Sequence, residues 1–197
     1  MDILLATNNR HKREEHSGIL TGPRLLLPSD IGLTFACEET GATYYDNALL
    51  KGETLYRQTG RPVLADDSGL SVTALNGAPG IHSARFGEMP GGRNLTDADK
   101  YRLLLERMAG ETDRTAFFIC CLVFVAGPWR CYSVQETLSG TLLTEPAGRG
   151  GFGYDPVFWL YNNVSLAELT EERKNEISHR GRSIRKLVFL LRGIKRV

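Results

Sequence analysis

The chain has 197 residues, of which 42% are hydrophobic and 24% are charged. This composition predicts a folded globular protein with a sizeable core, and it excludes an intrinsically disordered chain. Lys and Arg total 24 against 23 for Asp and Glu, so the formal net charge is only +1, which disfavours a general nucleic-acid or membrane-surface binder.

The predicted elements mix strands and helices along the chain. In chain order, the residue patterns predict a strand over 2–6, a polar helix to about residue 20, a helix over 43–59, a strand over 62–65 that ends at Asp66, a strand over 70–75, a turn over 76–80, a loop over 87–92, a helix over 96–108, strands over 115–126, 130–138 and 140–144, and a helix over 180–192. Gly60 and Thr96 are residue types that cap helices at those two ends. The last helix places Ile184, Leu187 and Leu191 on one apolar face.

This order, with hairpins in the middle of the chain, predicts an α/β fold on a mixed sheet. No repeat, low-complexity tract or linker divides the sequence, so residues 1–197 are expected to form a single domain. The longest apolar run, residues 116–126, is too short for a membrane span. The N-terminus lacks signal-peptide features and the cysteines form no C-x-x-C pair, which favours reduced thiols in a cytoplasmic protein.

Residues 7–12, Thr-Asn-Asn-Arg-His-Lys, stand where the first strand meets the first helix. Backbone N–H groups at a helix start favour an anion, and Lys12 adds a positive charge. The glycines of a Walker A loop are absent. The segment therefore predicts either a phosphate-binding loop or a capped turn with surface charges.

Asp66 and Asp67 follow a buried strand, where two adjacent carboxylates are unfavourable unless something compensates their charge. Neighbouring side chains on a strand point to opposite faces, so one Asp could face a cleft while the other braces the turn. A divalent hard cation is a suitable partner for such oxygens. An Asx-turn is the alternative interpretation.

Two other segments could present polar groups to the same ligand. Glu38 and Glu39 precede a helix on which Asn47 and Lys51 share a face, because they are four residues apart. That face could offer an amide and an ammonium group, or it could be a solvated surface.

Glycine-rich residues 148–153 allow a backbone to approach a flat or anionic ligand closely. Phe152 and Tyr154 could stack on a base, and Asp155 could accept a hydrogen bond from a base N–H. A purely structural turn is the alternative.

The charges are unevenly distributed. Residues 171–197 hold nine cations and three acids, whereas residues 38–67 hold six acids and three cations. One basic and one acidic region in a neutral chain suit a polyphosphate and a metal, although a basic tail could also serve solubility alone. His179 and Arg180 could donate hydrogen bonds to carbonyl oxygens of a base.

Seven strings in this order resemble the inosine/xanthosine triphosphate pyrophosphatase family: A-T-N-N-R-H-K (6–12), E-E-T-G (38–41), D-N-A-L-L-K (46–51), A-D-D-S-G-L (65–70), G-A-P-G-I-H-S-A-R-F (77–86), G-G-F-G-Y-D-P (150–156) and S-H-R-G (178–181). The resemblance runs nearly end to end, and the fourth and sixth strings are its most specific parts. The chain departs from the family pattern at Asn8, where Gly is common, and at Asp46, where Glu is common.

The resemblance implies a two-lobed α/β fold on an elongated mixed β-sheet, with flanking helices, a central nucleotide cleft and a homodimer. It implies Mg²⁺-dependent hydrolysis of ITP, dITP and XTP to the monophosphate and pyrophosphate, which cleanses the nucleotide pool. The near-neutral charge and the lack of a long apolar run predict no nucleic-acid or membrane partner.

The resemblance also implies roles for particular residues. Asp67 is implied as metal ligand and proton acceptor, and Glu38 as a second metal ligand. The implied substrate-binding residues are Thr7, Asn8, Asn9, Arg10, His11, Lys12, Asn47, Lys51, Ser68, Phe152, Gly153, Tyr154, Asp155, Lys174, His179 and Arg180.

These roles lead to a mechanistic hypothesis. Water oriented or deprotonated by Asp67 attacks the α-phosphorus, while Lys12, Lys51 and Lys174 offset the charge of the phosphates. Donors from His179 and Arg180 favour a 6-oxo purine over adenine.

Three alternatives stay open. The first is a related pyrophosphatase for modified pyrimidines or methylated bases. The second is a nucleotide sensor that binds but does not hydrolyse. The third is a nucleic-acid-binding module that uses the basic C-terminal helix, and it predicts strongly salt-dependent binding.

Overall fold

The computed structural model describes residues 2–20, 22–89, 91–160 and 164–194. Pro90 of the loop predicted at 87–92, and Lys195 and Arg196 of the basic segment, lie outside the described residues. The chain forms two compact units. The first unit comprises Met1–Ser68, Cys120–Glu136 and Asn175–Val197, and the second comprises Gly69–Ile119 and Thr137–Lys174. Within the described part of the chain, no helix combines the length and apolar character needed to cross a membrane.

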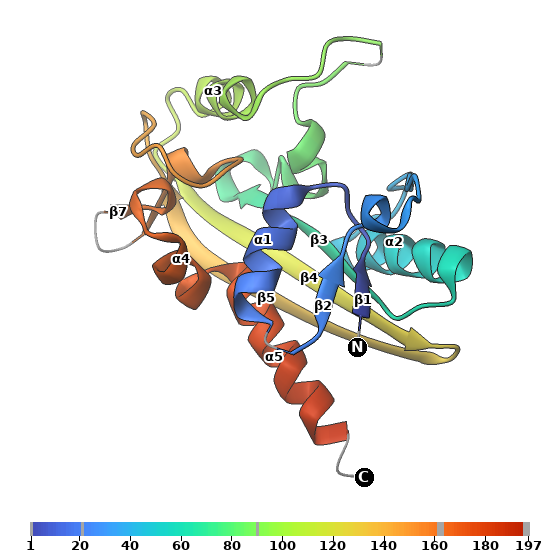
Figure 1. The fold of residues 1–197 in the computed structure, drawn as a ribbon. Coiled ribbons are helices and arrows are strands. Elements are labelled where there is room, and N and C mark those ends of the chain that lie inside the picture. Colours follow the sequence, from blue (N-terminus) through green and yellow to red (C-terminus); the bar gives the residue numbers. More distant parts are fainter. Residues whose placement is uncertain (1, 21, 90, 161–163, 195–197) are drawn as a thin grey trace. The chain divides into compact units, whose positions relative to one another are not determined.

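A mixed seven-stranded sheet forms in the order β2-β1-β3-β4-β5-β6-β7 (Figure 1). The strands are β1 Asp2–Leu5, β2 Arg24–Leu26, β3 Val63–Val72, β4 Thr115–Gly127, β5 Arg130–Leu142, β6 Phe158–Leu160 and β7 Val164–Ser165. β1 pairs in parallel with β2 and β3, whereas β6 pairs antiparallel with β5 and β7. The α/β fold on a mixed sheet predicted from the sequence is therefore confirmed.

The helices are α1 Arg10–Ile19, α2 Tyr44–Thr59, α3 Asp97–Arg107, α4 Glu171–Ile177 and α5 His179–Ile194. The first residues of α2 and α3 are fixed by side chains that accept hydrogen bonds from unpaired backbone N–H groups. Thr43 and Thr96 cap α2 and α3, and each accepts a hydrogen bond from the backbone N–H three residues later. Gly60, with a φ of 63°, ends α2 in the left-handed conformation that glycine adopts most easily.

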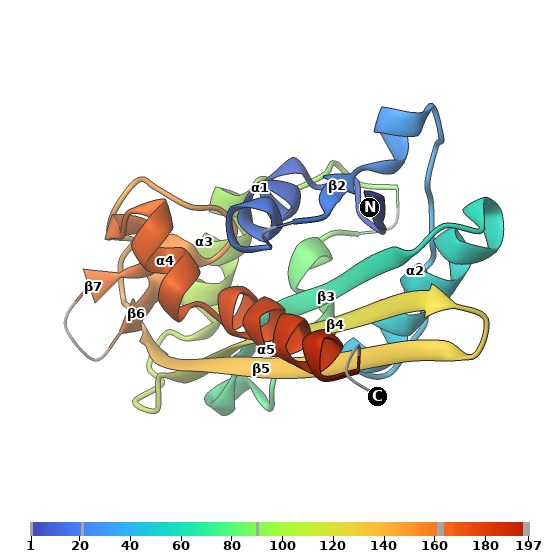
Figure 2. The same cartoon turned by 60° about the horizontal axis from the view of Figure 1, so that its bottom comes forward.

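The core of the first unit lies between the sheet and α5. Ile3 of β1 and Leu64 of β3 pack in one buried cluster with Leu122 of β4 and with Ile184 and Leu187 of α5. Figure 2 shows α5 lying along β4 and β5. This packing confirms the apolar face predicted for the last helix, and it holds the first turn of α5 beside β3.

The second unit is held by aromatic packing and by one arginine. The Phe118 and Phe158 rings lie 4.6 Å apart between centroids. Arg114 donates hydrogen bonds to the carbonyl oxygens of Met108, Leu142 and Leu143, at 3.3, 2.8 and 2.6 Å. These contacts tie β4 and the end of β5 to the turn that follows α3.

Two predicted strand breaks are wrong. β3 continues from Val63 to Val72 through the two aspartates, and β5 continues from Arg130 to Leu142. Glycines at these two positions allow close packing. A Cβ on Gly69 would lie 2.4 Å from the carbonyl oxygen of Gly80, and one on Gly140 would lie 2.5 Å from the Phe158 ring.

The sequence patterns also missed β2, β6, β7 and α4. The three strands contain two or three residues each, which is too short for an alternating pattern to be recognised. Ser165 precedes a 3₁₀ turn over Leu166–Glu168, and its backbone N–H donates to Glu168 Oε2 at 2.8 Å.

Two residues on α5 test whether packing on the sheet stabilises the first unit. Ile184 is 1% exposed, whereas Phe189 is 82% exposed. We expect Ile184→Ala to lower the free energy of unfolding by about 2–5 kcal/mol, because it leaves a cavity in the core. Phe189→Ala is expected to change it by less than about 0.5 kcal/mol. Urea unfolding followed by circular dichroism measures both, and equal effects would contradict the packing described above.

Candidate active site

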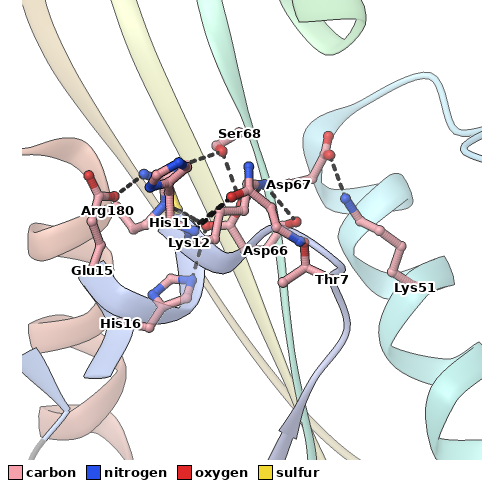
Figure 3. A network of polar contacts seen from close by, with 12 residues as sticks. Thr7, His11, Lys12, Glu15, His16, Lys51, Asp66, Asp67, Ser68 and Arg180 are labelled. Atoms are coloured by element: carbon pink, nitrogen blue, oxygen red, sulfur yellow. Dashed lines mark hydrogen bonds and ion pairs between the residues drawn. The ribbon is translucent and has the colours of Figure 1, made fainter. Parts of the chain in front are cut away.

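Asp66 of β3 is the centre of a buried polar network in the first unit (Figure 3). Its Oδ1 accepts hydrogen bonds from Lys12 Nζ and, at 3.0 Å, from Ser68 Oγ. Its Oδ2 accepts one from Arg180 Nε at 2.9 Å. The Asp66 side chain is fully buried, so these donors replace the water that an exposed carboxylate would bind.

The charges around Asp66 decide its protonation state. Burial alone would raise the pKa of Asp66, but Lys12 and Arg180 beside it hold that pKa well below its ordinary value. Asp66 is therefore a carboxylate at neutral pH. Since donors occupy both of its oxygens, it acts as an anchor for the two cations.

Arg180, in the first turn of α5, directs its guanidinium group at three side chains. Besides Asp66, it donates to Ser68 Oγ at 2.8 Å and forms an ion pair with Glu15 of α1. Burial would lower the pKa of Arg180, but Asp66 and Glu15 raise it. The donors that the sequence hypothesis assigned to a base oxygen thus contact Asp66, Ser68 and Glu15 in this structure.

Two further groups complete the network around Asp66 Oδ2. His16 Nε2, from α1, lies 3.2 Å from this oxygen, and Cys120 Sγ, from β4, donates to it at 3.5 Å. Burial raises the pKa of the Cys120 thiol well above its ordinary value, so Cys120 is a neutral donor. Neither residue stands out in the sequence, since a lone His on a polar helix carries no distinctive pattern.

Asp67 belongs to a second cluster. Lys51 Nζ donates to Asp67 Oδ1 at 2.7 Å and to Glu39 Oε1 at 2.7 Å. Burial would lower the pKa of Lys51, but the two carboxylates raise it, so Lys51 is an ammonium group between them. The alternation of side chains along β3 explains why neighbouring aspartates join different clusters.

The free oxygen of Asp67 suits a cation. Asp67 Oδ2 is buried and has no hydrogen-bond partner among the described residues. Burial raises the pKa of Asp67 although Lys51 opposes the shift, and the negative charge of Glu39 raises it further. A divalent cation would relieve this excess of negative charge. No group of three or more His, Cys, Asp or Glu side chains able to hold a metal occurs in the described residues, and Mg²⁺ is typically bound by one or two carboxylates with water and phosphate oxygens.

The predicted metal ligand Glu38 is not the glutamate that the structure brings to Asp67. Its side chain is exposed, and no described residue forms a hydrogen bond or ion pair with its carboxylate. Glu39 instead shares Lys51 with Asp67. In an irregular segment, the sequence pattern cannot tell which of two neighbouring glutamates faces the site. Only the fold shows that Glu39, twelve residues before Lys51, is the one that contacts it.

The E-T-G segment before α2 is held by Asn47. Asn47 is fully buried, and its Oδ1 accepts a hydrogen bond from the backbone N–H of Gly41 at 2.8 Å. A Cβ on Gly41 would lie 2.5 Å from the Asp46 Cβ, so only glycine fits there. Asp46, the departure from the family pattern, serves as the reciprocal partner of Thr43 in the cap of α2.

The segment 7–12 forms the predicted turn into α1. Asn9 caps the helix, with Oδ1 accepting from the backbone N–H groups of His11 and Lys12 at 2.9 and 3.3 Å. Asn8, where the family often has glycine, donates to the Phe35 carbonyl oxygen at 2.9 Å. Thr7 Oγ1 accepts from the Asn9 backbone N–H at 3.1 Å. Arg10 and His11 are exposed.

The remaining predicted residues lie in the second unit, except for His179, which is buried at the start of α5. Asp155 Oδ2 accepts hydrogen bonds from the Phe152 backbone N–H at 2.8 Å and from Lys174 Nζ at 2.7 Å. Lys174 Nζ also lies 4.7 Å from the centroid of the Phe152 ring. Tyr154 donates to the Ser83 carbonyl oxygen at 2.9 Å.

These contacts shape the glycine-rich segment of the second unit. A Cβ on Gly151, which has a φ of 70°, would lie 2.2 Å from Asp155 Oδ2. The backbone N–H of Gly153 donates to Asp97 at the start of α3, at 2.7 Å. The role of this segment in binding stays a prediction, while the roles of Asp97 and Ser83 as its supports became visible only in the fold.

A known protein family matches nearly the whole chain. The Ham1 family matches residues 3–190 of the chain. This chain belongs to the Ham1 family. The resemblance inferred from the seven strings is thereby confirmed.

Several relatives with known names have substantial sequence identity to this Ham1 protein. A dITP/XTP pyrophosphatase of Treponema denticola is 46% identical over 194 residues, which cover 98% of this chain and 100% of the relative. One of Staphylococcus epidermidis is 40% identical and covers 100% of this chain and 99% of the relative. The structure of the Staphylococcus aureus Ham1 protein superposes with a TM-score of 0.86 at 36% identity, covering 98% and 99% of the two chains.

The buried network of this Ham1 protein predicts an asymmetric response to two similar substitutions. We expect Asp66→Asn to lower the free energy of unfolding by about 3–5 kcal/mol, because Lys12 and Arg180 lose the carboxylate that compensates their burial. Asp2→Asn removes a surface ion pair with Arg61, whose atoms are 3.4 Å apart, and is expected to change it by less than about 1 kcal/mol. Urea unfolding of both variants tests this. A mild effect of Asp66→Asn would contradict the anchoring role.

Proposed function

We propose that this Ham1 protein hydrolyses the non-canonical purine nucleotides ITP, dITP and XTP to the monophosphate and pyrophosphate. The names of its relatives support the substrate class. The observation that carries the chemistry is Asp67 Oδ2, a buried carboxylate oxygen that has no hydrogen-bond partner among the described residues. A hydrolase for phosphoanhydrides needs such an oxygen to hold a cation or to accept a proton.

The phosphate chain is proposed to bind at the cations of the first unit. Lys12 and Lys51 are held near Asp66 and Asp67 by ion pairs, and each ammonium group can turn to a phosphate oxygen. Thr7 to Lys12, at the start of α1, are proposed to contact the phosphates together with Asn47 and Ser68. Positive groups fixed in advance stabilise the charge that develops on the leaving pyrophosphate.

Mg²⁺ is proposed to be held by Asp67 and Glu39. When bound, the ion supplies positive charge to the phosphate oxygens. Lys51 contacts both carboxylates and keeps them close to each other. Asp66 is not included, because Lys12, Ser68 and Arg180 already occupy its oxygens.

Asp67 is proposed to orient the attacking water and to accept its proton. Burial raises the pKa of Asp67, which makes this carboxylate a stronger base than an exposed aspartate. The water attacks the α-phosphorus, the bond to the bridging oxygen breaks, and the pyrophosphate leaves as an anion.

The base is proposed to contact the glycine-rich segment of the second unit. Phe152, Gly153, Tyr154 and Asp155 would supply stacking and hydrogen-bond groups, and Lys174 fixes the Asp155 carboxylate. His179 is proposed as a donor to the 6-oxo group. Arg180, whose nitrogens contact Asp66, Glu15 and Ser68, is proposed to act mainly by holding those side chains.

The two glutamates offer a matched test of the metal site. We expect Glu39→Gln to weaken activation by Mg²⁺ by about tenfold or more, because it removes a ligand and half of the ion pair with Lys51. Glu38→Gln is expected to change it less than about twofold, as the exposed carboxylate is solvated. The measurement is dITP turnover against Mg²⁺ concentration. The reverse order would restore Glu38 as the ligand.

Asp67→Asn is expected to lower kcat by a factor of about 10² to 10⁴, because the amide cannot accept the proton from water. Its thermal unfolding should remain cooperative. Product analysis that separates pyrophosphate from orthophosphate supplies the readout. Near-normal turnover of this variant would exclude the proposed base, and binding of dITP without any hydrolysis by the unmodified protein would instead favour a nucleotide sensor.

Discrimination among bases is tested with dITP, XTP, GTP and ATP side by side. A donor facing the amino group of adenine leaves two buried polar groups unpaired, so we expect kcat/KM for dITP to exceed that for ATP by about 10- to 100-fold. Equal values would exclude selective recognition of the 6-oxo group.

A single catalytic domain over residues 1–197, a homodimer and a cytoplasmic location complete the proposal. The four cysteines, all among the described residues, are free thiols, which accords with a reducing compartment. Light scattering coupled to size-exclusion chromatography tests the dimer.

A further inference from the structure

His16 is a buried histidine that the proposed reaction does not use. It is on α1, a helix whose other residues are exposed or partly exposed, yet its own side chain is fully buried. Figure 3 shows its ring beneath Asp66, on the side away from Lys51. A polar ring placed in a dry position needs a reason, because an isoleucine or leucine would fill the same space without desolvating nitrogen atoms.

The contacts of the ring define its tautomer. Asp66 is ionised, so its Oδ2 can only accept, and the hydrogen atom belongs on Nε2, 3.2 Å away. Nδ1 then carries the lone pair. Both ring nitrogens are buried, and neither makes a well-aligned hydrogen bond to a described residue, so the approach of Nε2 to Asp66 Oδ2 is a close polar contact and Nδ1 keeps a free lone pair. The ring is therefore neutral here, with one nitrogen left that can bind a proton.

Charged groups face His16 from each element around it. Lys12 and Glu15 come from its own helix, Asp66 from β3 and Arg180 from α5, while Cys120 of β4 is neutral. With His16 neutral, the two cations balance the two anions. Burial, Arg180 and Lys12 all lower the pKa of His16, whereas Asp66 raises it.

This balance depends on Lys12. In the structure, Lys12 Nζ contacts both a carboxylate oxygen and the backbone carbonyl oxygen of Asp66, the latter at 3.5 Å. If Lys12 transfers to a phosphate of the substrate, Asp66 and Glu15 retain only Arg180 as a cation. The three buried side chains Asp66, Glu15 and Arg180 then carry a net charge of −1, which is unfavourable in a site without water.

We infer that His16 is a positioning residue that takes up a proton when Lys12 leaves Asp66 for the substrate phosphates. The inference rests on the proposed function, because it requires Lys12 to bind phosphate. The proton comes from solvent and binds to Nδ1, and the imidazolium replaces the ammonium group as a cation beside Asp66. The proton is released from Nδ1 to solvent when the products leave and Lys12 returns to Asp66. His16 thereby keeps Asp66 ionised and Arg180 in place throughout the cycle.

The sign of the pH dependence follows from this exchange. Since substrate binding takes up a proton, lower pH favours binding, and the dissociation constant falls as the pH decreases toward 6. The effect is up to about tenfold for each unit by which the pKa of His16 rises on binding. A histidine with a purely structural role would show no such linkage.

Calorimetric titration with the α,β-methylene analogue of dITP and Mg²⁺ tests the inference without turnover. Measured at about pH 6.5 in two buffers with different protonation enthalpies, the binding enthalpies give the number of protons taken up. His16→Gln retains an N–H donor toward Asp66 but cannot bind the proton, and His16→Leu lacks both properties. His82→Gln, which alters an exposed histidine of the second unit, is the matched control.

We expect the unmodified protein and His82→Gln to take up about half a proton more than either His16 variant. We also expect His16→Gln to retain the affinity at pH 8 and to lose its increase toward pH 6. Equal proton uptake in the unmodified protein and in both His16 variants would overturn the inference while leaving the proposed function intact. Failure of the analogue to bind the unmodified protein would overturn both. Cooperative thermal unfolding of each variant shows that it is folded. If His16→Gln does not fold, His16→Leu is used for the comparison of proton uptake.

Discussion

A carboxylate that is removed from water needs hydrogen-bond donors of the protein in place of the water molecules that would hydrate it. Asp66 meets this requirement with Lys12 from α1, Ser68 from its own strand and Arg180 from α5. The two charged donors come from helices that also make apolar contacts with the sheet, α1 through Ile19 and α5 through Ile184 and Leu187. The ion pairs therefore exist only when β3, α1 and α5 are all in place, and the polar site is part of the way the first unit holds together.

Because side chains alternate along a β-strand, the two adjacent aspartates have different surroundings and suit different roles. Asp66 is saturated with donors and stays ionised, whereas Asp67 retains a buried oxygen without a protein partner, and burial raises its pKa. A saturated carboxylate can hold cations in position, and an unsaturated one can bind an ion or a proton. Neither residue could perform both tasks, because the donors that stabilise the first would occupy the oxygen that the second must keep available.

Side chains and backbone groups that support neighbouring segments occur in both units. In the first unit, Asn47 holds the backbone at Gly41, and His16 contacts the anchor aspartate. In the second unit, Asp97 and the carbonyl oxygen of Ser83 hold the glycine-rich segment. Such contacts limit the conformations of the segments at the candidate site, and fixed supports of this kind favour a single geometry.

The sequence by itself determined the fold class, the longer helices with their caps and the family, because each rests on a local pattern of residue types. Only the tertiary structure decided that Asp66 and Asp67 lie within one continuous strand, that Glu39 rather than Glu38 shares Lys51 with Asp67, and that Arg180 turns toward Asp66. Those outcomes depend on contacts between residues from 12 to 114 positions apart, such as Lys51 with Glu39 and Arg180 with Asp66. The fold also decided the need for glycine at Gly69 and Gly140, since atoms of Gly80 and Phe158, which are distant in the sequence, occupy the space that a Cβ would need.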